Sequence, residues 1–285
     1  ALLFTEMVNA TSLGMGHGVC KIEELSNEKG PIAVQLFDHR PEAMSEAAKI
    51  AEGYGAFLID INMGCPVKKI ARKGGGSALL NNIQLAEEIV RKVSSSVNIP
   101  VTVKTRLGWD EESANPLEFS LRLQEAGATL LTLHGRTRKQ GFSGKANWHK
   151  IKEVKEALNI PVIANGDINN IDNALNCLKT TGADGLMIGR GCMGAPWLLG
   201  QIHAVLQGSS LIAEPKAKEK ISIALEQLKE LVNRKGDHGL LIARKHINWT
   251  CKGFPEAIDL RHKVIQAKTP GEAIKILENE LLEKL

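Results

Sequence analysis

A cysteine followed by basic residues marks one segment of the chain as a candidate site. Cys65 lies in Asn-Met-Gly-Cys-Pro, directly after the apolar run 57–62, and four cations follow it: Lys68, Lys69, Arg72 and Lys73. Nearby positive charge stabilises a thiolate and attracts an anionic substrate. Such a thiol can act as a nucleophile or donate a proton. The alternative is a small buried cysteine at a turn, since free cysteine often behaves as a core residue.

Two further polar residues end apolar runs. Lys104 comes late in Val-Thr-Val-Lys, where strand alternation turns its side chain to the inside. An ammonium in that position needs an anion or a cofactor carbonyl as its partner. His134 ends the run 130–134. A single histidine without a second ligand nearby in sequence does not predict a metal site, so we expect no bound metal.

Two glycine-containing turns end the last two apolar runs. They are Asn165-Gly166-Asp167 and Gly189-Arg190-Gly191. Backbone N–H groups and an arginine in such turns commonly bind phosphate. Together they predict a site for a phosphorylated cofactor such as FMN.

Short apolar runs alternate with amphipathic stretches along most of the chain. We expect strands at Leu2–Val8, Ile32–Phe37, Phe57–Asn62, Val101–Thr105, Leu130–His134, Val162–Asn165 and Gly185–Ile188. We expect helices at Pro41–Tyr54, Ile83–Val97, Leu117–Ala126, Trp148–Ala157 and Asn170–Thr181. This alternation is typical of a parallel α/β fold.

The polar residues follow nearly every predicted strand, which favours a TIM-type (β/α)8 barrel over an open doubly wound sheet. An open sheet concentrates its site at one switch point, whereas a barrel builds its site from most strand ends. Only seven strands are predicted, and the chain opens directly in the first of them. We therefore expect a shortened form that lacks the first barrel strand.

After residue 208 only helical periodicity remains. The expected domains are a catalytic barrel over 1–208 and a small all-α domain over 209–285, with 14 Lys and Arg against 11 Asp and Glu in the latter. One apolar face over 221–232 predicts a long helix, and Thr-Pro-Gly-Glu at 269–272 predicts a capped helix start. The basic clusters 244–246 and 261–263 lie in this region.

Composition excludes several classes of protein. The 285 residues are 43% hydrophobic and 24% charged, and the five cysteines are scattered. These values argue against disorder and against a disulfide scaffold. No apolar run is long enough to span a membrane, and we expect a cytoplasmic protein. With 4% aromatic residues, any contact with nucleic acid must depend on phosphate charge and shape.

Several segments resemble one enzyme family, the tRNA-dihydrouridine synthases, and in particular their bacterial B-type branch. They are 59–66, 76–80, 101–106, 133–138, 163–168, 187–191 and, in the tail, Ala-Arg-Lys-His at 243–246. The resemblance implies a barrel that binds FMN, NADPH as reductant, tRNA as partner, no membrane association and no stable protein partner. The family's first strand carries a Pro-Met-Ala-type segment, and none precedes Ala1.

The resemblance also implies roles for individual residues. Hydride passes from the flavin to C6 of a uridine while Cys65 protonates C5. The residues implied for FMN are Gln35, Lys104, His134, Asn165, Gly166, Asp167, Gly189 and Arg190. Those implied for the substrate are Asn62 at the uracil edge, Arg136 and Arg138 near the nucleotide, and Arg244 and Lys245 on tRNA.

Two other functions remain open from the sequence. One is a flavin barrel that reduces a free pyrimidine or a similar small enone, which does not require the basic tail. The other is a non-catalytic tRNA-binding protein.

Overall fold

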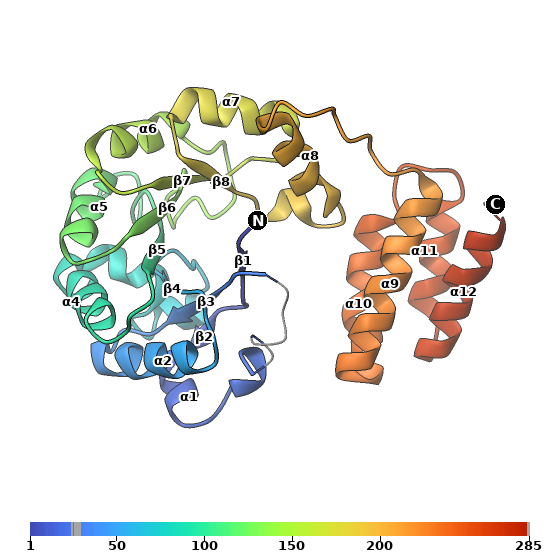
Figure 1. Ribbon diagram of the computed structural model, residues 1–285, viewed down its shortest axis with the longest axis horizontal. Coiled ribbons are helices and arrows are strands. Elements are labelled where there is room, and N and C mark those ends of the chain that lie inside the picture. Colours follow the sequence, from blue (N-terminus) through green and yellow to red (C-terminus); the bar gives the residue numbers. More distant parts are fainter. Residues whose placement is uncertain (24, 26–29, 284–285) are drawn as a thin grey trace. The chain divides into compact units, whose positions relative to one another are not determined.

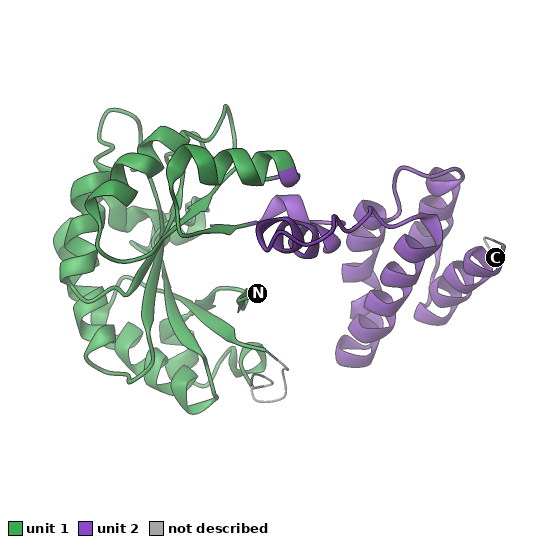
Figure 2. Cartoon of the chain, turned by 45° about the horizontal axis from the view of Figure 1, so that its top comes forward, with its two compact units in different colours: residues 1–168, 172–187 green, residues 169–171, 188–285 purple. Residues whose placement is uncertain are grey.

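The computed structural model describes residues 1–23, 25 and 30–283. The chain divides into two compact units, 1–168 with 172–187, and 169–171 with 188–285 (Figure 2). Residues 188–208 thus group with the helical tail, whereas the sequence patterns favoured a domain division at 208.

The first unit is a curved sheet of parallel strands with helices on its outer side (Figure 1). Its order is β1-β3-β4-β5-β6-β7-β8, with β2 also paired to β3. The strands are β1 Leu3–Phe4, β2 Val8–Asn9, β3 Ile32–Phe37, β4 Leu58–Asn62, β5 Val101–Arg106, β6 Leu130–His134, β7 Val162–Asn165 and β8 Gly185–Met187. From β3 onward each strand pairs with the next in sequence, as in a (β/α)8 barrel, so the predicted fold class is confirmed.

The single strand expected over 2–8 is wrong in detail, because β1 and β2 are separate segments. Leu3 pairs with Ile32, whereas Asn9 pairs with Phe37, so the chain has one extra residue between the two segments. Such a bulge interrupts the ladder. The hydroxyl of Thr5 fills the gap by accepting the backbone N–H of Gln35 at 3.1 Å.

Capping residues set the starts of the first unit's helices. Its helices are α1 Ala10–Gly14, α2 Pro41–Gly53, α3 Lys68–Ala71, α4 Ile83–Ser94, α5 Pro116–Glu125, α6 Trp148–Ala157 and α7 Ile171–Thr181. Side chains of Asn82, Asn115 and Asn147 accept a backbone N–H three residues on, at 3.1, 3.3 and 3.2 Å. These bonds satisfy donors that a helix start otherwise leaves without partners.

Strand alternation sorts the first unit's side chains onto two faces. Ile61, Val103 and Leu131 are fully buried and lie in register on β4, β5 and β6. They share one face of the sheet, and the helices of the first unit cover its outer side (Figure 1). The polar side chains of Asn62, Lys104 and Thr132, in register at the next positions, lie on the other face and contribute to the site.

The second unit is helical. Its helices are α8 Trp197–Leu206, α9 Ala217–Lys235, α10 Asp237–Thr250, α11 Ala257–Gln266 and α12 Pro270–Glu283. Leu228, Leu240, Leu260 and Leu277 lie in one core, which confirms the predicted apolar face of α9. The predicted cap of α12 is also present, since the hydroxyl of Thr269 accepts the backbone N–H at 272 at 3.2 Å. None of the described helices is long and apolar enough to cross a membrane.

Candidate active site at the strand ends

A chain of hydrogen bonds links polar side chains of β3 and β4. Gln35 donates its amide N–H to a carboxylate oxygen of Asp60 at 2.7 Å, and Asn62 donates to the amide oxygen of Gln35 at 2.8 Å. A carboxylate can only accept, so Asp60 fixes the orientation of the Gln35 amide, and Gln35 in turn fixes that of Asn62.

Asn62 continues this chain to the cysteine. Its side-chain oxygen accepts the backbone N–H groups of Gly64 and Cys65 at 3.1 and 2.9 Å. On the other side Ser77 donates its backbone N–H to the carbonyl of Cys65 at 3.2 Å. Gly76 has φ +59°, and a Cβ there would lie 3.1 Å from the Cβ of Cys65. The backbone of Cys65 is therefore held from both sides, and the residue is partly exposed.

Lys104 lies on β5 beside Asn62 and projects to the same inner face. Its ammonium donates to the side-chain oxygen of Asn165 at 3.1 Å, and Asn165 donates to the carbonyl of Met187 at 2.7 Å. Burial lowers the pKa of Lys104 to about 8, although the negative charges of Asp60 and of a Cys65 thiolate raise it. The side chain is thus charged at neutral pH.

Asp60 is a buried acid that the sequence analysis missed. It is 0% exposed, and burial raises its pKa to about 6, against the hydrogen bonds from Thr102 and Gln35, which lower it. It is ionised at neutral pH, which gives Lys104 a counter-charge. The pattern Ile-Asp-Ile-Asn contained the signal, because residues 60 and 62 share one strand face.

His134 ends β6 and is neutral at physiological pH. Burial and the positive charges of Arg106, Lys104 and Arg136 lower its pKa to about 3. Its Nε2 lies 3.5 Å from the guanidinium of Arg136. Arginine only donates, so Nε2 accepts and the proton lies on Nδ1. His134 can therefore offer an N–H to a ligand without adding charge.

Arg136, which is buried, forms an ion pair with the partly exposed Asp167. One guanidinium nitrogen of Arg136 contacts both carboxylate oxygens at 2.7 and 2.8 Å and also donates to the carbonyl of Gly144 at 2.6 Å. Asp167 also accepts the backbone N–H of Ala146 at 2.7 Å. Arg136 is only 2% exposed. This geometry favours a role in holding the loop after β6 and does not favour the expected contact with substrate.

The turn after β7 has a constrained backbone. Gly166 has φ +116°, and a Cβ there would lie 2.8 Å from the ring of His134. Asp167 has φ +58°, which is uncommon for a residue other than glycine. The ion pair with Arg136 compensates for this conformation and keeps the turn packed against His134.

Arg106 is a second residue that the sequence analysis missed. It is 4% exposed and donates to the carbonyls of Gly64, Thr137 and Gly141 at 2.8, 3.1 and 2.9 Å. These bonds connect the turn that holds the cysteine to the loop after β6. Arg106 lies two residues after Lys104, so strand periodicity alone could have assigned it to the inner face.

The remaining predicted residues lie elsewhere. Arg138 stacks on Trp109, with 4.3 Å between the guanidinium carbon and the ring centre. Gly189 and Arg190 follow β8 and belong to the second unit. In that unit Arg244 donates to the carbonyl of Ala267 at 2.6 Å, and the ammonium of Lys245 lies 5.2 Å from the ring centre of Trp249.

The inner face has hydrogen-bonding capacity that the described residues leave unused. The ammonium of Lys104 has three donors, and the described residues provide one acceptor, on Asn165. The hydroxyl of Thr132, in register with Lys104 on β6, is buried and has no partner among them. Together with Nδ1 of His134, these groups suit a planar ligand rich in carbonyl and ring nitrogen atoms, which fits a flavin.

This arrangement defines a barrel-type enzyme, with its polar side chains at the carboxyl ends of parallel strands. A solved structure of morphinone reductase in complex with tetrahydroNAD has a similar fold. It superimposes with a TM-score of 0.50 at 14% sequence identity, over 75% of this chain and 80% of that chain.

Sequence comparisons define the family. A model described as "Dihydrouridine synthase (Dus)" matches residues 1–285. "Probable tRNA-dihydrouridine synthase 1" from Synechocystis is 48% identical over 281 residues, covering 99% of this chain and 79% of the relative. "tRNA-dihydrouridine synthase B" from Pasteurella multocida is 43% identical over 252 residues, covering 88% and 76%. The chain belongs to the dihydrouridine synthase family and is an oxidoreductase, as the resemblance implied.

Proposed function

We propose that this protein reduces a uridine of tRNA to 5,6-dihydrouridine, with FMN as cofactor and NADPH as reductant, in the cytoplasm. The observation that carries the proposal is the joint placement of Cys65 and Lys104 at neighbouring strand ends, with Asn62 between them holding the cysteine backbone. The family supports the reaction, and the names of the relatives support tRNA as the substrate.

The unused donors of the inner face support a flavin site. In this proposal Lys104 and Nδ1 of His134 donate to the ring, while Asn165 orients Lys104 through their 3.1 Å contact. Gln35 and Gly166 shape the site, and for Gly189 and Arg190 the family resemblance alone implies contacts to the cofactor phosphate. Bound flavin supplies the hydride that adds to C6 of the uracil ring.

Cys65 supplies the proton that completes the reduction. As the C5–C6 double bond is consumed and hydride adds to C6, electron density develops at C5, and the thiol proton transfers there. The remaining thiolate is stabilised by the charge of Lys104, an attraction that is one of the contributions raising the Lys104 pKa. Asn62 presents one amide N–H toward Met7, whose sulfur is 3.9 Å away and accepts only weakly, so this donor remains available for a uracil carbonyl.

The predicted cationic residues divide into two roles. We assign Arg136 and Asp167 to positioning, because their mutual bonds use the groups that would otherwise contact ligand. We keep Arg138, Arg244 and Lys245 as candidate contacts to tRNA, where phosphate neutralisation supplies much of the affinity.

The test is a visible absorption spectrum of the purified protein, recorded before and after addition of NADPH and then of unmodified tRNA. The proposal predicts an oxidised-flavin band that bleaches with NADPH and returns with tRNA, together with one dihydrouridine per flavin reoxidised under anaerobic conditions. Reoxidation by free uridine at the same rate would favour a small-molecule reductase. A protein that binds tRNA yet takes up no FMN would favour a non-catalytic role.

A further inference from the structure

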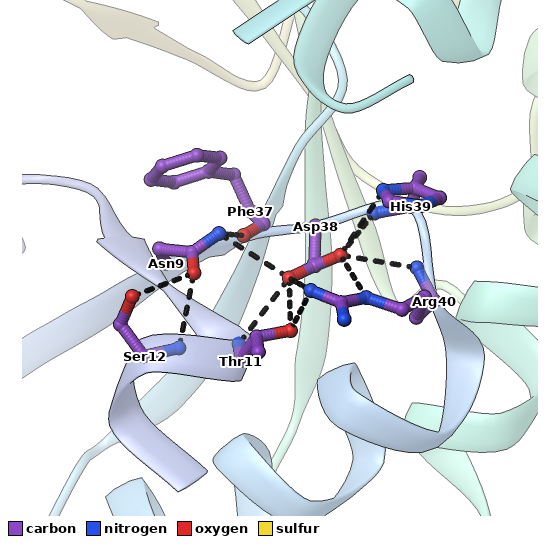
Figure 3. A network of polar contacts seen from close by, with 7 residues as sticks. All are labelled: Asn9, Thr11, Ser12, Phe37, Asp38, His39 and Arg40. Atoms are coloured by element: carbon purple, nitrogen blue, oxygen red, sulfur yellow. Dashed lines mark hydrogen bonds and ion pairs between the residues drawn. The ribbon is translucent and has the colours of Figure 1, made fainter. Parts of the chain in front are cut away.

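A pocket of about 440 Å³ opens beside the cysteine turn, outside the polar chain that links Asp60 to Cys65. Its walls come from the end of β2, the turn after β3, and the segment 67–75 with helix α3. The volume falls in the range of small-ligand sites, roughly 300–1,000 Å³. Figure 3 shows the polar network that forms one side of this pocket.

A buried carboxylate organises that side of the pocket. The Asp38 side chain is 2% exposed and accepts hydrogen bonds from the hydroxyl of Thr11 at 2.6 Å, the amide of Asn9 at 3.2 Å and the backbone N–H of His39 at 2.8 Å. Arg40 contacts both carboxylate oxygens at 3.1 Å (Figure 3). Asp38 thus joins two segments that are far apart in sequence.

The charge of Asp38 is balanced within this network. Burial alone would raise the pKa of Asp38, but the hydrogen bonds from Arg40, Thr11 and the backbone lower it well below its usual range. The carboxylate therefore stays ionised and neutralises Arg40. What remains at the pocket is the charge of Lys69 and Lys73, which form no ion pair within the part of the chain that the structure describes.

The pocket also has apolar lining. Phe37, Val67 and Ile70 contribute to it, and Val67 is 49% exposed. Two unbalanced ammonium groups suit a phosphate, and an apolar wall with an aromatic ring suits a base or a sugar. The combination fits a nucleotide better than a free inorganic anion.

The pocket is next to the turn that holds Cys65. Gly75 lines the pocket, and the following glycine packs against Cys65. Helix α3, which carries Lys69, begins three residues after Cys65. A strand whose target base reaches Cys65 would therefore present an adjoining nucleotide to these lysines.

We propose that this pocket binds a phosphate-bearing nucleotide of the substrate RNA strand, next to the nucleotide that is reduced. The inference rests on the proposed function for the identity of the strand. The basic set 68–73 then has two parts. All four cations are exposed, but only Lys69 and Lys73 line the pocket, whereas Lys68 and Arg72 do not.

This division provides a charge-matched experiment. The double variant Lys69→Ala, Lys73→Ala removes two pocket charges, and Lys68→Ala, Arg72→Ala removes two charges from the same segment outside the pocket. Affinity for unmodified tRNA is measured by filter binding at several salt concentrations. The pocket variant is expected to bind about tenfold more weakly, with a salt slope lower by about 1.4–1.8, the value for two lost phosphate contacts. The control variant is expected to change affinity less than twofold.

Two results would overturn the proposal. The first is an equal loss in both double variants, or no loss in either, which would assign any effect to general surface charge. The second is unchanged tRNA affinity with a raised KM for NADPH in flavin reduction without tRNA, which would assign the phosphate to the reductant. Binding is measured without turnover, so it tests the pocket independently of the reaction. If only the pocket variant lost affinity for tRNA and the wild-type protein formed no dihydrouridine, the pocket would be supported and the proposed reaction would be wrong.

Discussion

The strand ends of the first unit bury charged side chains, whereas the helical core of the second unit buries apolar ones. Asp60, Lys104 and Arg106 lie in a sheet interior, where each charge is stable only because another group compensates for it. Leu228, Leu240 and Leu277 are buried in a core that needs no such pairing. The stability of the second unit therefore depends on how well apolar side chains fill its core, whereas the function of the first unit depends on the placement of individual atoms.

The largest expected effect concerns the thiol of Cys65 in the first unit. Cys65→Ala removes the proposed proton donor, and general acid catalysis contributes roughly 10²- to 10⁴-fold. We expect tRNA-dependent reoxidation of the reduced flavin to slow by about that factor, while flavin content stays unchanged. Stopped-flow absorbance measures the rate.

Cys20→Ala is the matched control for this change, because Cys20 is a free, exposed cysteine. It should reoxidise at the wild-type rate. A Cys65→Ala protein as fast as wild type would remove the thiol from the mechanism.

The second prediction tests the helical core. Leu228 is 0% exposed, and Leu→Ala at such a site costs about 2–5 kcal/mol. Leu228→Ala should lower the temperature at which the second unit unfolds, as followed by circular dichroism, and leave flavin affinity within twofold of wild type.

Leu282→Ala removes the same atoms from a side chain that is 65% exposed. Its effect should stay within about 0.5 kcal/mol. If flavin affinity fell in parallel with stability in Leu228→Ala, the contrast between the two units would fail.

The smallest expected effect concerns the charge of Lys104. Its pKa is lowered to about 8, so the ammonium that would bind flavin is lost as pH rises above that value. Flavin affinity should be steady below pH 8 and then fall by up to about tenfold per pH unit, because one proton is linked to binding. Quenching of flavin fluorescence on binding measures this affinity at each pH.

Lys104→Arg keeps its charge throughout this range, so its affinity should not vary with pH between 7.5 and 9.5, whatever its absolute value. A wild-type affinity that is equally flat would show that Lys104 does not contribute its charge to the flavin.

Much of the site could be predicted because strand alternation and parallel strand pairing together place its residues. Alternation places residues 62, 104 and 134 on one strand face, and parallel pairing brings the strand ends to one edge. No comparable regularity relates Arg136 to Asp167, which are 31 residues apart on different loops. Their bond depends on the backbone of each turn, so the sequence did not indicate it, and the contact between Arg136 and the substrate that the family resemblance implies stays a prediction.

The pocket was beyond prediction for a related reason. Lys68 to Lys73 form one basic run in sequence, and only the short helix α3 decides which of its side chains line the pocket. Asp38 gave no signal, because Thr11, one of its partners, is 27 residues away in the sequence.

That interrupted strand determines where the chain can change in length. Between β1 and β2, residues 5–7 span the same stretch of β3 that two residues would span in a regular ladder. Deletion of Glu6 alone would leave Leu3 opposite Ile32 and Asn9 opposite Phe37. An insertion or deletion within β3 itself would turn Gln35 to the opposite face. Single-residue gaps among natural homologues should therefore collect at 5–7 and be absent from 32–37.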